Sequence, residues 1–306
     1  MHLILMAIER KKDKYGNKMR HRGGALLRMT AAIVFWLLVW QLFSFLIGSE
    51  LLLPSPWAVV RSFCGLAQTT EFYRSILHTL LRVAAGFAAG MAAGLLAGTL
   101  TAFSRVADVL LTPLKNIIKA TPVTSFIVLI LLYFSSNVTP SAVAFLAVLP
   151  ICWSNVCEGL RQTDKKMTEL AHAYAFGRKK TLREIYFPAV RPYLSAAATT
   201  GLGFAWKSCV AAEVIALSKN SVGRALYESK LYLETAELFA WTASVVLISV
   251  LFEKLLVHKL FKNKNTEGAA GRRSESLEHG HASCEAELQY KSDAYAEYGR
   301  DEERNI

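Results

Sequence analysis

The chain of 306 residues contains six long apolar runs that polar segments separate. The runs cover about residues 30–48, 77–103, 109–134, 142–160, 193–217 and 238–260. Each approaches or exceeds the roughly 20 residues that a helix needs to cross the hydrocarbon core of a bilayer. The composition, 53% hydrophobic and 19% charged, also suits a membrane protein better than a soluble domain. We therefore predict an all-α polytopic membrane protein with six transmembrane helices.

Lysine and arginine orient these spans. Eight of them lie in residues 1–29, and eight more lie in residues 161–191, between the fourth and fifth runs. By the positive-inside rule both segments are cytoplasmic, and six spans return the C-terminus to the cytoplasm as well. This topology accounts for the net charge of +11, so we expect membrane lipid, and no nucleic acid, among the partners.

The predicted organisation has three parts. A basic cytoplasmic segment covers residues 1–29, a transmembrane domain covers 30–261, and a disordered cytoplasmic tail covers 262–306, where the apolar periodicity stops. Residues 49–76, which include Pro54 and Pro56, and residues 218–237 are predicted outer loops. His279, His281 and Cys284 lack a fourth ligand at a recognised spacing, so we expect no metal site and no cofactor.

Two spans have unusual features. Gly86, Gly90, Gly94 and Gly98 recur every four residues along one side of the second span, which predicts close packing with another helix, either within the chain or in a dimer. The run at 109–134 is interrupted by two prolines with two lysines between them. A plain kink is the commoner explanation, and a moving or pore-adjacent element is the alternative. The residues concerned are Pro113, Lys115, Lys119 and Pro122.

The cytoplasmic segment at 169–188 contains apolar residues at roughly helical spacing, with Gly177 interrupting them. We interpret it as two short helices joined at a bend. Its aromatic and aliphatic side chains lie among basic residues and require a contact surface. The lipid headgroup layer is one candidate and a protein partner on the same side of the membrane is the other.

This segment resembles the EAA loop of binding-protein-dependent ABC importer permeases. That loop reads E-A-A, three residues, glycine, nine residues, I-x-L-P. Glu169, Ala171, Ile185 and Pro188 match its glutamate, second alanine, isoleucine and proline without a gap.

Three positions depart from the pattern. Leu170 replaces the first alanine, Ala175 stands at the glycine and Phe187 replaces the leucine. Gly177 lies two positions beyond the expected glycine, near the cap of the second helix. Whether the bend lies at Ala175 or is shifted therefore stays open.

The fifth span contains a second resemblance. Its A-W-K-x-x-V-A-A-E string, which includes Trp206, Lys207 and Glu213, resembles the nitrate/taurine/sulfonate branch of these permeases, and the resemblance covers about residues 53–260. Ionisable groups at membrane depth require protein or water around them, or lie near an interface and snorkel. Lys207 and Glu213 point about 120° apart on a helix, so we expect no direct pair. The three residues are predicted translocation-path residues.

The resemblance implies the permease subunit of an ATP-driven importer in the inner membrane of a prokaryote. Its partners are two ABC ATPase subunits, a second permease copy in a homodimer and an extracytoplasmic solute-binding protein. The chain has no P-loop motif, so we predict a non-catalytic subunit with ATP hydrolysis on a separate chain. The predicted ATPase-coupling residues are Glu169, Leu170, Ala171, Ala173, Tyr174, Ala175, Phe176, Gly177, Ile185 and Pro188.

The resemblance to this branch implies a small anionic solute such as nitrate, a sulfonate or taurine. Pyrimidine precursors of thiamine are also compatible with the branch. A secondary transporter or channel without an ATPase is the main alternative function, with Lys207 and Glu213 as its converging ionisable groups. A structural membrane protein is the third.

Overall fold

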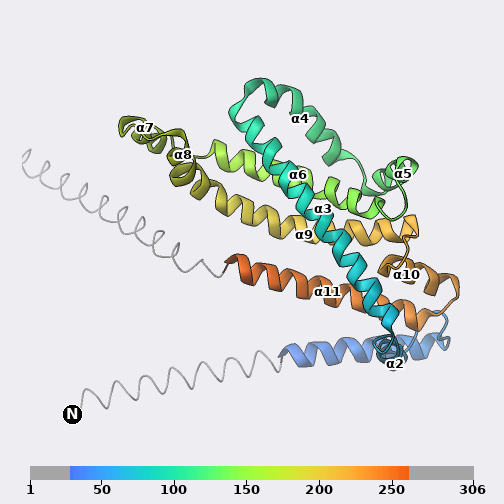
Figure 1. Cartoon of the computed structure of the whole chain (residues 1–306). Coiled ribbons are helices and arrows are strands. Elements are labelled where there is room, and N and C mark those ends of the chain that lie inside the picture. The colour runs from blue at the N-terminus through green and yellow to red at the C-terminus, as the bar shows by residue number, and fades with distance from the viewer. Residues whose placement is uncertain (1–27, 262–306) are drawn as a thin grey trace, which may run out of the picture. The chain divides into compact units, whose positions relative to one another are not determined.

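The computed structural model describes residues 28–261 (Figure 1). Almost all of the predicted basic segment at 1–29 and the whole predicted tail at 262–306 lie outside the described residues and stay predictions. The chain divides into two units, residues 1–253 and 254–306, and the packing described below lies within the first.

Every element in the described part of the chain is helical. An N-terminal helix, Arg28–Ile47, comes first. The helices that follow are α2 (Pro56–Leu66), α3 (Thr70–Phe103), α4 (Arg105–Ala120), α5 (Val123–Tyr133), α6 (Thr139–Arg161), α7 (Lys165–Ala173), α8 (Arg178–Thr181), a π-helical turn (Leu182–Tyr186), α9 (Phe187–Ala216), α10 (Val222–Leu231) and α11 (Thr235–Phe261).

Both segments predicted as outer loops contain helices, which corrects the expectation of plain loops, and their outer location stays a prediction. Ser55 caps α2 by accepting a hydrogen bond from the Ala58 N–H at 3.2 Å, and Pro56 occupies the first turn, where its missing N–H is harmless. α3 already begins at Thr70, within the same segment. The second predicted loop contains α10, which Ser221 caps by accepting from the Arg224 N–H at 3.0 Å. Pro56 and the polar residues Ser55 and Ser221 therefore mark the starts of helices.

Within residues 28–261, four helices are long and apolar enough to cross a membrane by length and composition: the N-terminal helix, α3, α6 and α11. A fifth span results if α4 and α5, which meet at a bend of 105°, count as one. α9, which contains the fifth predicted span, is not among these. Its 30 residues are rich in Ala, Gly, Ser and Thr, and Lys207 and Glu213 lower its hydropathy further. The number of six spans therefore stays a prediction.

The glycine face of α3 packs against α6, as Figure 1 shows for the two crossing helices. A Cβ atom added at Gly94 would lie 2.6 Å from the Cβ of Cys152 and 2.9 Å from the Leu149 carbonyl oxygen, and the other three glycines are equally confined. The predicted close-packing face is therefore used within the chain. The α6 side chains that meet it are Ala144, Val148, Cys152 and Val156.

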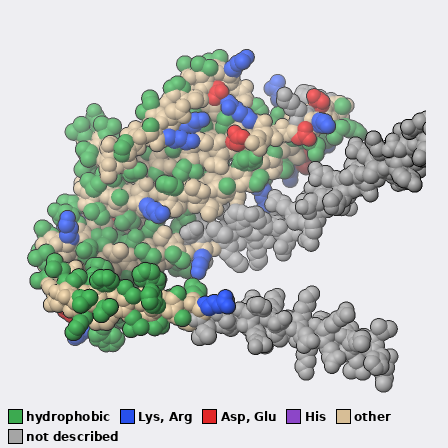
Figure 2. Space-filling model, turned by 180° about the vertical axis from the view of Figure 1, so that it is seen from behind, with side chains coloured by type: hydrophobic (Ala, Val, Ile, Leu, Met, Phe, Trp, Pro, Cys, Tyr) green, Lys and Arg blue, Asp and Glu red, His purple; other side chains and the backbone are tan. Residues whose placement is uncertain are grey.

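Large apolar side chains cover much of the surface (Figure 2). On the N-terminal helix even Trp36 and Phe45 are exposed, and on the short helix α5 Leu132 is exposed. Apolar patches of this extent are unfavourable in water, so they indicate contact with lipid or with other helices. The N-terminal helix is joined to the rest of the chain by hydrogen bonds from the Trp40 indole to Pro54 O at 3.1 Å and from the Ser44 hydroxyl to Leu53 O at 3.0 Å.

Candidate functional site

The predicted coupling segment begins with α7. Asp164 starts this helix by accepting a hydrogen bond from the Lys166 N–H at 2.9 Å. Met167, Leu170 and Tyr174 recur at spacings of three and four, so they share one side of the helix, and all three are exposed. The apolar surface that the sequence indicated is therefore uncovered in the isolated chain.

The bend lies at Ala175, where the family has glycine. Ala175 has φ of 52°, the left-handed conformation that favours glycine, whereas Gly177 has φ of −65° and ψ of 154°, which any residue adopts. The N–H of Phe176 donates to the Ala171 carbonyl at 2.8 Å and closes the turn. The alternative of a shifted bend is thereby excluded, and Gly177 is the N-cap of α8.

The second helix of the segment is not short, which corrects the two-short-helix interpretation. α8, the π-helical turn and α9 follow one another without a break from Arg178 to Ala216, through Pro188. The Phe187 N–H bonds to Leu182 O, five residues back, and this wider turn precedes the proline. A proline ring would otherwise clash with the carbonyl four residues before it, so the π turn lets the helix continue.

The predicted coupling residues lie in two environments. Ala171 is only 4% exposed, so bulk at this position would disturb the fold of the segment itself. Ala173 is exposed, and Phe176 is partly covered because the Lys180 ammonium lies 4.0 Å from its ring centroid. Of the others, Ile185 is half-buried, and the exposed ones are Glu169, Leu170, Tyr174, Ala175, Gly177 and Pro188.

The three predicted path residues lie on different sides of α9. Trp206 and Glu213 are buried, whereas Lys207 is exposed on the side that also carries Thr200 and Phe204. Glu213 does not pair with Lys207, as their angular separation predicted. It pairs with a residue of another helix.

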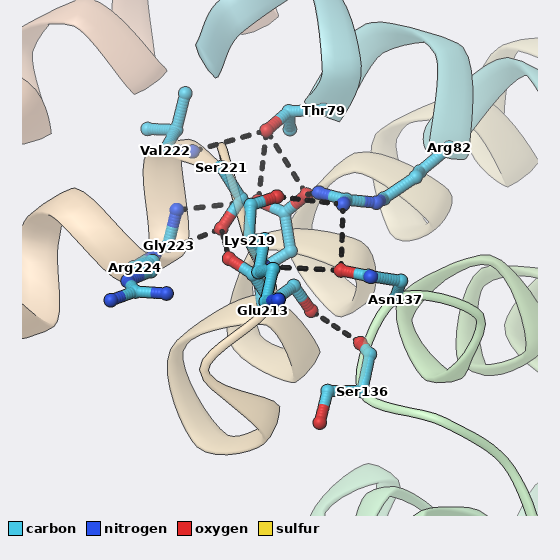
Figure 3. A network of polar contacts seen from close by, with 11 residues as sticks. Thr79, Arg82, Ser136, Asn137, Glu213, Lys219, Ser221, Val222, Gly223 and Arg224 are labelled. Carbon is cyan, nitrogen blue, oxygen red and sulfur yellow. Dashed lines mark hydrogen bonds and ion pairs between the residues drawn. The ribbon is translucent and has the colours of Figure 1, made fainter.

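Glu213 is fully buried and lies at the centre of a polar network that joins α3, α9 and α10 (Figure 3). Arg82 Nη1 donates to its Oε1 at 2.9 Å. The Thr79 hydroxyl lies 3.0 and 2.9 Å from the two carboxylate oxygens, and the Gly223 N–H donates to Oε2 at 3.2 Å. A buried carboxylate requires such pairing and hydrogen bonding.

Gly223 is required by the close approach of α10 to α9. A Cβ atom at this position would collide with the backbone and Cβ of Glu213. The remaining Arg82 nitrogen, Nη2, donates to the Asn137 side-chain oxygen at 3.3 Å and to the Lys219 carbonyl at 2.9 Å. The network thus also fixes the connection between α5 and α6 and the connection between α9 and α10.

Sequence reasoning missed Thr79 and Arg82. The available signal was a single arginine inside the apolar run at 77–103, because an ionisable residue at membrane depth requires a partner. Glu213 is the buried acid that supplies it, and no other acid is buried in the part of the chain that the structure describes.

The geometry defines an all-helical integral membrane protein with an exposed amphipathic helix, a left-handed bend and a continuous helix leading from it into the helical core. The chain belongs to the family of binding-protein-dependent transport system inner membrane components, whose sequence model matches residues 90–258.

Named relatives agree with this family. The chain is 27% identical to the putative aliphatic sulfonates transport permease protein SsuC of Bacillus subtilis, over 74% of this chain and 84% of the relative. It is 30% identical to the riboflavin transport system permease protein RibX of Chloroflexus aurantiacus, over 76% and 89%. It is 24% identical to the bicarbonate transport system permease protein CmpB of Synechococcus elongatus, over 69% and 80%.

The chain is accordingly a multi-pass inner-membrane permease subunit of an ABC importer in the nitrate/taurine/sulfonate branch. This assignment favours the importer over the secondary transporter or channel.

Proposed function

We propose that this permease passes a small anionic solute into the cytoplasm in a complex with two ATPase subunits, which hydrolyse ATP on separate chains. A second copy of the chain completes the membrane part as a homodimer, and an extracytoplasmic solute-binding protein delivers the solute. Lipid surrounds the exposed apolar helices. In this arrangement the chain has six spans, and both termini and α7 are cytoplasmic.

The observation that carries the proposal is the exposed apolar side of α7. Tyr174 is 71% exposed and Leu170 is 54% exposed, in a segment whose own caps and turns are satisfied. Apolar side chains that a rigid segment holds in this way favour a protein groove as their contact. Arg178, Lys179 and Lys180 follow directly on α8 and add positive charge beside this surface.

The continuous helix supports α7 as the coupling element. From Arg178 to Ala216 it would extend about 58 Å at 1.5 Å per residue, and it ends just after Glu213. A movement that an ATPase imposes at α7 and α8 would therefore reach the polar network along one helix. The T-shaped contact between Phe103 and Tyr186, with ring centroids 5.3 Å apart, joins the π-helical turn to the end of α3 as well.

The anionic solute class rests on relatives and on charge. Two of the relatives are named for aliphatic sulfonates and bicarbonate, and one is named for riboflavin. Lys207 lies on the uncovered side of α9, where a basic group favours an anion, and we propose it as a path residue. Trp206 and Glu213 also remain proposed path residues. Their burial means that they would act only if this side of α9 opened.

The coupling proposal is tested with two matched variants of exposed tyrosines. Tyr174→Asp changes the proposed contact surface, and Tyr232→Asp changes the connection after α10, which is equally exposed and far along the chain. We expect the ATPase to co-purify with wild type and with Tyr232→Asp, and to be lost at least tenfold with Tyr174→Asp. Retention of the ATPase by both Tyr174→Asp and Ala173→Glu would overturn α7 as the docking surface.

The homodimer is tested on the same preparations. The mass of the detergent-solubilised complex is expected to fit two copies of this chain with two ATPase subunits. A complex that contains one copy of this chain beside a different permease would replace the homodimer with a heterodimer.

A further inference from the structure

α4 carries an apolar side and a polar stripe. Asp108, Thr112, Lys115 and Lys119 follow one another at spacings of four, three and four residues, which places them along one side of the helix. The first three are half-buried. The apolar residues Val106, Val109, Leu110 and Ile117 are exposed on the other side. The apolar side suits lipid, and the polar stripe is turned to protein or water.

Two groups of this stripe have partners within the chain. Asp108 pairs with Arg161 at 2.6 Å and accepts a hydrogen bond from the Thr112 hydroxyl at 2.9 Å. The Lys115 ammonium lies 5.7 Å from the ring centroid of Trp153 on α6. The stripe therefore runs along α6 from its end at Arg161 toward its middle.

Lys119 ends the stripe at a cavity of about 240 Å³. This half-open cavity lies beside the bend between α4 and α5, and residues of α6 and α9 also line it. Thr121 and Thr200 contribute hydroxyl groups, and the rest of the lining is apolar, with Phe126, Pro150 and Phe204 among it. Lys119 is the one charged residue of this lining.

No carboxylate pairs with Lys119 among the residues that the structure describes. The three ion pairs found there join Arg82 to Glu213, Arg161 to Asp108 and Arg224 to Glu228. An ammonium in the middle of a predicted span, beside an apolar cavity, is unfavourable without a counter-charge or water. Its charge is therefore complementary to an anion that enters the cavity.

We propose that this cavity binds the oxyanion group of the solute, with Lys119 as the counter-charge and the Thr200 hydroxyl as a hydrogen-bond donor, because the Thr121 hydroxyl already donates to the Ile117 carbonyl at 2.8 Å. The inference rests on the proposed function, and it gives the proposed translocation path a binding site and a substrate class. The apolar lining suits a short alkyl group attached to a sulfonate or carboxylate. The volume is below the roughly 300–1,000 Å³ of sites for drug-sized ligands, which suits a small solute.

The test measures binding of radiolabelled ethanesulfonate to the detergent-purified complex of the full chain with its ATPase. Ethyl methyl sulfone serves as the uncharged competitor of similar shape. Lys119→Gln removes the charge, Lys119→Arg keeps it, and Lys230→Gln removes an exposed lysine of α10 as the matched control. For each variant, co-purification of the ATPase shows whether the chain folds and couples, and this readout does not depend on solute binding.

We expect wild type, Lys119→Arg and Lys230→Gln to bind ethanesulfonate, and Lys119→Gln to bind it at least tenfold more weakly while it retains the ATPase. The sulfone should not compete. Equal binding by wild type and Lys119→Gln, or no binding by wild type, would overturn the site and leave the importer proposal standing. Displacement of ethanesulfonate by phosphatidylglycerol at stoichiometric amounts would assign the cavity to a lipid headgroup and also overturn it.

Discussion

Ala175 holds a backbone conformation that an alanine side chain disfavours. With φ of 52° it lies in the left-handed region, where a Cβ atom costs about 1–2 kcal/mol. The fold of the segment nevertheless places the turn here, because the Phe176 N–H to Ala171 carbonyl bond requires it. The fold of the segment sets the left-handed conformation at position 175, and Ala175 adopts it in spite of the strain.

Ala175→Gly is therefore expected to stabilise the turn by about 0.5–1 kcal/mol, since relief of strain exceeds the entropy that glycine gains in the unfolded chain. Hydrogen exchange of the α7 amides should slow by up to about fivefold. Gly177→Ala is the control, because Gly177 has an ordinary φ and nothing within 4 Å of an added Cβ. If Gly177→Ala changed exchange more than Ala175→Gly, the bend would not lie at Ala175.

Glu213 and Arg82 form a pair whose members depend on each other. Glu213→Gln leaves the guanidinium without a counter-charge and with neutral acceptors only, so we expect a loss near the lower end of the about 3–5 kcal/mol that breaking a buried ion pair costs. The measurement is thermal unfolding in detergent. The double variant Arg82→Met with Glu213→Gln should recover part of the loss, because it leaves no unpaired charge. A Glu213→Gln variant as stable as wild type would contradict the structural role of the network.

At the scale of elements, the contact between α3 and α6 depends on the absence of side chains. Gly94→Ala would place a Cβ 2.6 Å from that of Cys152, so the helices must separate, and overpacking of this kind costs about 1–3 kcal/mol. Gly203→Ala is the matched control on α9, where an added Cβ meets nothing within 4 Å. It should raise stability by up to about 1 kcal/mol through helix propensity. The measurement is thermal unfolding in detergent. A Gly94→Ala variant at least as stable as wild type would refute this packing of α3 against α6.

The apolar runs predicted the long helices well, because a segment without internal charge has few alternatives to a helix in a bilayer. The prediction failed at Pro188. The general rule that proline ends a helix favoured a boundary there, but the helix continues through this residue. The π turn at Leu182–Tyr186 removes the clash by hydrogen-bond geometry, which no residue pattern encodes. The sequence left open whether the bend lies at Ala175, since alanine is uncommon at positive φ.

At the scale of the whole molecule, the sequence predicted which residues lie at membrane depth better than what they contact. Lys207 and Glu213 were recognised as ionisable groups in a span, and their separate directions were correct. The partner of Arg82 is known only from the contact between α3 and α9. The cavity beside Lys119 is known only from the packing of the bend between α4 and α5 against α6. Such partners come from helices far apart in the sequence, which periodicity cannot connect.

α9 decides the topology of the whole chain, because α7 precedes it and α10 follows it. Its 30 residues would extend about 45 Å, which exceeds the roughly 30 Å of the hydrocarbon core. Its low hydropathy is compatible with spanning, since much of its surface contacts α6 and α3 in place of lipid. We therefore predict that α7 and α10 lie on opposite sides of the membrane.

Cysteine labelling in intact cells tests this arrangement. In a background where Cys64 and Cys284 are serine, the Tyr232→Cys variant should react with an impermeant maleimide added outside. The Ala173→Cys variant should react only after the membrane is permeabilised, because both positions are exposed and only the bilayer separates them from the reagent. Outside labelling of both variants would mean that α9 does not cross. An ATPase could then not reach α7 from the cytoplasm, so the coupling proposal would fall together with the prediction that α9 spans the membrane.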